Sequence, residues 1–127
     1  MSTAFNPSRG LVIVTVQVYG PDGDTVARLA LDTGALGTLI SPAILVTVGY
    51  DMSQAPEHVR IVTASRTERV PRLVLNQITA LGQTQADVPT LCHALPAATQ
   101  VDGVLGLDFI RGQRLVVDFR TGHVTLE

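Results

Sequence analysis

Asp32 is the carboxylate whose sequence context best suits chemistry. It ends an apolar, strand-like run, and Thr33, Gly34 and Ala35 follow it into a predicted turn. A carboxylate held at such a position can act as a general acid or base. Asp-Thr-Gly alone is weak evidence, because Asp and Gly are favoured at strand-to-turn junctions anyway. Its flanks are more specific, since a small residue follows the glycine and an Ile-Ser pair then leads into a predicted helix.

Cys92 and His93 offer a second possibility, a thiol nucleophile beside a base. Adjacent side chains on a strand point to opposite faces, so these two cannot easily form such a pair. We expect a small buried cysteine and a surface histidine. The three histidines lack metal-ligand spacing, and a single cysteine excludes an internal disulfide and multi-cysteine metal sites. We therefore expect neither a metal nor another cofactor.

Composition excludes several other classes of function. All nine cationic side chains are arginine, which removes mechanisms that need a Schiff-base, Ser-Lys or P-loop lysine. The net charge of -2 gives no field that would attract nucleic acid or a membrane surface. No segment reaches the roughly 18 apolar residues of a membrane span, and residues 1–10 lack a signal-peptide pattern. We expect a cytoplasmic protein with an N-terminal segment, 1–10, and one domain, 11–127.

The elements that must position Asp32 are short strands. Apolar, β-branched runs separated by turn residues about every ten positions predict strands at 11–19, 25–31, 38–40, 73–81, 84–90, 115–119 and 123–127. Two further runs within 60–75 flank a polar centre at 64–67 and predict a projecting hairpin. Ser41 and Pro42 predict a helix that extends to about Val48 and ends at Gly49, and residues 107–111 predict one helical turn. This pattern is typical of an all-β barrel or sandwich with two small helices.

A second motif lies about seventy residues after Asp32. Val104-Leu105-Gly106-Leu107-Asp108-Phe109 carries an apolar pair into a glycine and then into the predicted helical turn. Together with Asp32-Thr33-Gly34-Ala35 and the closing Val117-Asp118-Phe119, it resembles the retropepsin-like aspartic proteases, most closely their bacterial single-domain branch. The resemblance extends from Leu11 to Leu126. It implies a closed-barrel fold with one lobe in each chain, and an aspartic endopeptidase.

This chemistry needs two carboxylates about 3 Å apart that share one proton, because like charges that close cannot both ionise. The ionised carboxylate activates a water molecule, and the protonated one polarises the scissile carbonyl. The chain has one Asp-Thr-Gly and no room for a second lobe. The dyad must therefore join Asp32 of two chains in a homodimer. The resemblance implies that the Thr33 hydroxyl clamps the two loops, while Gly34 lets the backbone approach closely.

The resemblance also implies a flap, formed by the hairpin around 63–67, under which an extended peptide binds through its main chain. The expected substrate-binding residues flank the catalytic loop or lie in this flap; they are Ala35, Leu36, Val62, Thr63, Ala64, Ser65 and Val104. The partners implied are thus a second copy of the chain and a peptide or protein substrate. An alternative from another class is a catalytically silent module that keeps the barrel and binds peptides or dimerises.

The chain departs from the retroviral members at three places. They often carry acidic residues soon after Asp-Thr-Gly-Ala, arginine before the later aspartate and a glycine-rich flap tip, whereas this chain has Leu36-Gly37, Leu107 and Ala64-Ser65-Arg66-Thr67. Arg111 could pair with Asp108 or Asp118 instead. Four arginines, at 60, 66, 69 and 72, cluster around the predicted flap. They indicate either a solvated hairpin face, which we favour, or a preference for acidic substrate residues.

Overall fold

The computed structural model describes residues 2–62 and 65–127. Its strands, in chain order, are β1 (Ser2–Ala4), β2 (Ile13–Gly20), β3 (Gly23–Leu31), β4 (Thr38–Ile40), β5 (Glu57–Val62), β6 (Thr67–Ala80), β7 (Gln83–Cys92), β8 (Gly103–Leu105), β9 (Leu115–Asp118) and β10 (His123–Leu126). Its helices are α1 (Pro42–Thr47), α2 (Leu107–Ile110) and the 3-10 turns η1 (Met52–Gln54) and η2 (Ala97–Thr99). No helix in these two ranges has the length and apolar character needed to cross a membrane.

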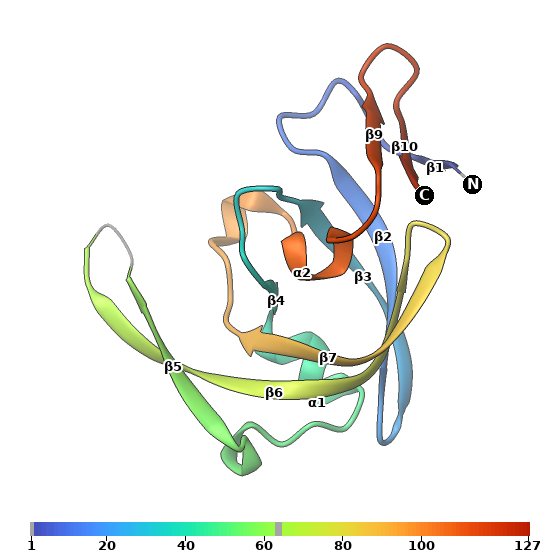
Figure 1. Ribbon diagram of the computed structural model, residues 1–127. Helices are drawn as coiled ribbons and strands as arrows, with labels where there is room; N and C mark the ends of the chain where they lie inside the picture. The colour runs from blue at the N-terminus through green and yellow to red at the C-terminus, as the bar shows by residue number, and fades with distance from the viewer. Residues whose placement is uncertain (1, 63–64) are drawn as a thin grey trace.

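The main sheet closes on itself. Its strand order is β2-β3-β8-β4-β7-β6-β5, and an additional pairing between β2 and β6 joins the two sides. Six strands thus form a barrel, with β5 attached outside it along β6 (Figure 1). The predicted all-β closed barrel with two short helices is confirmed.

The barrel encloses an aliphatic core. Alternate residues of β2 point inward, so Val14, Val16 and Val18 are almost completely buried. Leu29 of β3 and Phe109 of α2 pack into the same cluster. With few aromatic residues available, branched aliphatic side chains supply most of the apolar surface that stabilises the fold.

Strand β6 is longer than the sequence predicted. It is one strand of 14 residues that runs from the β5–β6 hairpin into the barrel and pairs with β5, β7 and β2. Its buried positions change phase twice, between Val70 and Leu73 and again between Leu75 and Ile78. These shifts break the period-two pattern, which is why the sequence suggested two separate strands.

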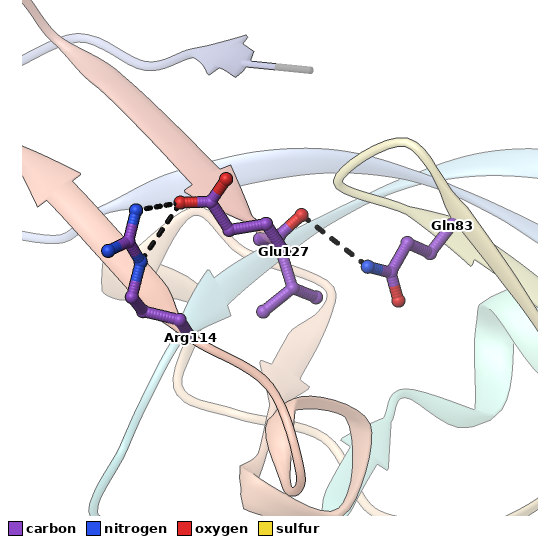
Figure 2. A network of polar contacts seen from close by, with 4 residues as sticks. Gln83, Arg114 and Glu127 are labelled. Atoms are coloured by element: carbon purple, nitrogen blue, oxygen red, sulfur yellow. Dashed lines mark hydrogen bonds and ion pairs between the residues drawn. The ribbon is translucent and has the colours of Figure 1, made fainter.

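The chain ends form a small second sheet of order β1-β10-β9. Residues 2–4, which the sequence analysis assigned to an N-terminal segment, pair with β10, and Phe5 is buried in the core. Figure 2 shows how the C-terminus is held: the Arg114 guanidinium pairs with the Glu127 carboxylate, and the Gln83 side-chain amide donates to the Leu126 carbonyl oxygen at 3.4 Å.

Candidate active site

Asp32 lies immediately after β3, at the start of the loop that leads to β4. The parallel pairing of β3 with β8 sets Leu31 opposite Leu105, and the Asp32 N–H donates to the Leu105 carbonyl at 3.1 Å. The Gly34 N–H donates to Asp32 Oδ1 at 2.8 Å, which orients the carboxylate. The other oxygen, Oδ2, accepts no hydrogen bond from the described part of the chain. Asp32, Thr33 and Gly34 are all exposed, so this carboxylate is open to water and to other molecules.

The corner between β8 and α2 supports the rest of this loop. The Leu107 N–H donates to the Ala35 carbonyl at 2.8 Å. Gly106 lies so close to the loop that a Cβ there would be 2.6 Å from the backbone of Gly37. The two motifs that stand about seventy residues apart in the sequence therefore form one structural unit around Asp32.

Asp108 makes contacts that the sequence did not predict. Its carboxylate accepts hydrogen bonds from the Thr38 N–H at 3.1 Å and from the Thr38 hydroxyl at 2.9 Å. Arg111, proposed as a partner of Asp108 or Asp118, belongs to none of the ion pairs among the described residues. A threonine 70 residues away leaves no local signal in the sequence. The sequence indicated only that Asp108 would lie in the first turn of a short helix, where an acidic side chain is favourable.

The predicted substrate-binding residues do not all lie together. Leu36, 77% exposed, lines a cavity of about 360 Å³ whose wall also includes Val59 of β5 and Leu91 of β7. Ser65 lines a different cavity, of about 630 Å³. Val62, at the end of β5, is 81% exposed. Ala35 and Val104 are partly buried, in the loop and in β8 respectively, while Thr63 and Ala64 lie outside the described residues.

Several charged side chains of the β5–β6 hairpin form ion pairs with one another. Arg72 lies 3.3 Å from Glu57 across the two strands, and Arg66 pairs with Glu68. The other carboxylate oxygen of Glu68 lies 3.6 Å from Nε2 of His93, which is partly buried. For Arg66 and Arg72, these pairings favour a solvated hairpin face over a surface reserved for acidic substrates.

Cys92 is buried, as the sequence predicted, with only 4% of its surface exposed. Burial raises the pKa of its thiol, whereas an activated nucleophile needs a lowered pKa. Within the described ranges, no group of three or more His, Cys, Asp or Glu side chains could hold a metal ion. Asp32 therefore remains the candidate that the surrounding hydrogen bonds best support.

Comparisons with known proteins show which family the chain belongs to. A family model described as aspartyl protease matches residues 14–109, which include both the Asp32 loop and the β8–α2 corner. The crystal structure of a retropepsin-like aspartic protease from Rickettsia conorii superposes with a TM-score of 0.73 at 16% identity, and covers 99% of this chain and 88% of that one. No curated protein matches the sequence. The structural likeness concerns the fold, while the family model spans most of the sequence. The chain therefore belongs to the aspartyl protease family, with the retropepsin-like fold that its motifs predicted.

Proposed function

We propose that the protein is an aspartic endopeptidase that is active as a homodimer, with Asp32 of each chain forming the dyad. The observation that carries this proposal is the state of Asp32 itself. Its carboxylate is exposed at the start of the loop 32–37, yet backbone hydrogen bonds to β8 and α2 hold that loop in place. A fixed and accessible carboxylate suits a reacting group better than a surface charge on a mobile turn.

The chemistry requires a second carboxylate beside Asp32, and the sequence has no second Asp-Thr-Gly to provide it. A two-fold axis close to the loop would bring in the partner's Asp32, and Thr33 and Gly34 are exposed to make that contact. The two acids then share one proton. The ionised acid takes a proton from the attacking water while the protonated acid donates to the scissile carbonyl oxygen. As the tetrahedral intermediate collapses, the acid that took the water proton gives it to the leaving nitrogen, and the other acid takes the proton of an intermediate hydroxyl. The pair then shares one proton again, and no covalent enzyme intermediate forms.

An extended peptide is the substrate that best fits the surroundings. The β5–β6 hairpin projects from the barrel on the same side as the β3–β4 loop, which supports its role as a flap (Figure 1). The cavity beside Leu36 has a mostly apolar lining, with Arg72 and Asp108 as its charged members, and this suits an apolar side chain next to the scissile bond. We assign substrate contacts to the residues predicted from the sequence, namely Ala35, Leu36, Val62, Thr63, Ala64, Ser65 and Val104.

The test is cleavage of a reduced, unfolded protein substrate by Asp32→Asn beside a matched control, Asp87→Asn. Asp87 is also exposed, and its backbone φ of 53° is a value that asparagine adopts readily. We expect the wild type and Asp87→Asn to cleave between acidic and neutral pH. Asp32→Asn should not cleave, although the chain should keep its fold, because Asp32 lies outside the core and asparagine can still accept from the Gly34 N–H.

Two results would contradict the proposal. Cleavage by Asp32→Asn at the wild-type rate would remove Asp32 from the mechanism. A wild-type dimer that binds peptides but cleaves none at any pH would favour the silent binding module instead.

A further inference from the structure

We propose that Asp108 is a positioning residue for Asp32, which it controls through Thr38. This inference rests on the proposed catalytic role of Asp32. Its basis is a cluster of hydrogen bonds at the far end of the loop 32–38, where the loop becomes β4.

Both oxygens of the Asp108 carboxylate accept hydrogen bonds from the same chain. Oδ2 accepts from the Thr38 N–H at 3.1 Å, while Oδ1 accepts from the Thr38 hydroxyl at 2.9 Å and from the Phe109 N–H at 2.9 Å. The Thr38 hydroxyl in turn accepts from the Gly106 N–H at 3.3 Å. Both bonding directions of this hydroxyl are thus fixed, which locks the side chain in one orientation.

Burial makes these contacts strong. Thr38 is 1% exposed, so water does not compete with the Asp108 carboxylate for its N–H and hydroxyl. Hydrogen bonds to an ionised acceptor are about twice as strong as neutral ones, and a buried donor left without a partner is costly. Asp108 therefore holds Thr38, and with it the end of the loop, against the β8–α2 corner.

The effect reaches Asp32 because the loop is short and is tied down at few points. The Asp32 N–H is bonded to Leu105 and the Ala35 carbonyl to Leu107, both on the same corner as Asp108. Thr38 also pairs with Thr90 of β7, so β4 itself stays in place. Without the Asp108 contacts, the loop that precedes Thr38 can shift relative to the β8–α2 corner. A displacement of about 1 Å at a reacting group can cost about a hundredfold in rate.

Asp108 also lines the cavity beside Leu36, so a direct contact with substrate is the competing explanation. The two roles differ in kinetics. A positioning residue changes kcat and leaves KM nearly constant, whereas a lost substrate contact raises KM. Because both carboxylate oxygens already accept hydrogen bonds within the chain, we expect the first pattern.

The test compares Asp108→Ala, Asp108→Asn, Thr38→Val and Thr38→Ser with the control Asp51→Ala. Asp51 accepts from the N–H and the hydroxyl of Ser53, the same donor pair in an exposed turn away from the loop. We expect kcat to fall about a hundredfold in Asp108→Ala and Thr38→Val, and about tenfold in Asp108→Asn, with KM within about threefold. Thr38→Ser keeps the hydroxyl and should restore most of the rate, while Asp51→Ala should leave kcat unchanged.

Amide hydrogen exchange gives a second readout that does not depend on turnover. Faster exchange at Gly34 and Ala35 in Asp108→Asn, but not in Asp51→Ala, would support the proposal. Unchanged exchange at these amides together with unchanged kcat would overturn it, and so would a rise in KM alone. If the wild type cleaves no peptide, the proposed function fails, and exchange at Gly34 and Ala35 still decides whether Asp108 holds the loop.

Discussion

A single methyl group at Gly106 tests the contact between the β8–α2 corner and the catalytic loop. In Gly106→Ala, the new Cβ would lie 2.6 Å from the carbonyl carbon and oxygen of Gly37 and 3.0 Å from the Ala35 oxygen. All these atoms belong to the backbone, so no side chain can rotate out of the way. Restoring ordinary contact requires the loop and the corner to separate by about 0.8 Å.

Two consequences follow from that separation. Overpacking of this kind costs about 1–3 kcal/mol of unfolding free energy, and each kcal/mol lowers the Tm of a chain this long by about 4 °C. Because the displaced atoms lie within five residues of Asp32, kcat should also fall by between about tenfold and a hundredfold. The backbone φ of -96° at Gly106 suits alanine, so the effect is steric and not conformational.

The assay is thermal melting at one fixed protein concentration, with peptide cleavage measured well below the melting temperature. Gly10→Ala is the matched control, because a Cβ at Gly10 would meet nothing within 4 Å. If Gly106→Ala has the same melting temperature as Gly10→Ala and cleaves at the wild-type rate, the close packing of loop and corner is refuted.

Three further predictions concern groups outside the loop. Burial raises the pKa of Tyr50, whose hydroxyl accepts from the Asn76 N–H, so the unfolded state loses its tyrosine proton first. Wild-type stability should therefore fall above about pH 10, and the fall in pH-dependent urea melts should be smaller in Tyr50→Phe. Hydrogen bonds from backbone N–H groups, led by that of Thr121, lower the pKa of Asp118. The stability lost in Asp118→Asn should therefore be largest above about pH 4 and should vanish as pH falls through the lowered pKa. A Tm difference between the two proteins that is constant from neutral to strongly acid pH would contradict this. Cys92→Ala should cleave at a rate within about twofold of wild type, and loss of cleavage with an intact melt would revive the thiol mechanism.

Local patterns in the sequence predicted most of the barrel. Strand β4 occupies the predicted residues, and the helix that begins at Pro42 ends at Thr47, just before Val48. Proline, glycine and β-branched residues act on their immediate neighbours, so their effects can be read without the fold. The closing of the sheet was implied by the family resemblance and is confirmed by the pairing of β2 with β6.

Contacts between distant residues could not be predicted in this way. Residues 2–4 carry no apolar pattern and become a strand through pairing with β10, at the other end of the chain. Arg111 was considered for Asp108 because charge and short spacing are visible in a sequence. The partner in the structure is Thr38, a neutral side chain 70 residues away whose burial leaves its donors dependent on that carboxylate.

The most direct test of the central claim is the activity of mixed dimers. Wild-type protein is mixed with Asp32→Asn protein, allowed to exchange subunits, and assayed for peptide cleavage. If each active site needs Asp32 from two chains, random pairing reduces the wild-type activity to about a half with equal amounts and to about a tenth with a ninefold excess of the variant. Activity that stays constant at every ratio, with subunit exchange verified by mass spectrometry, would show that one chain acts alone and would contradict the account.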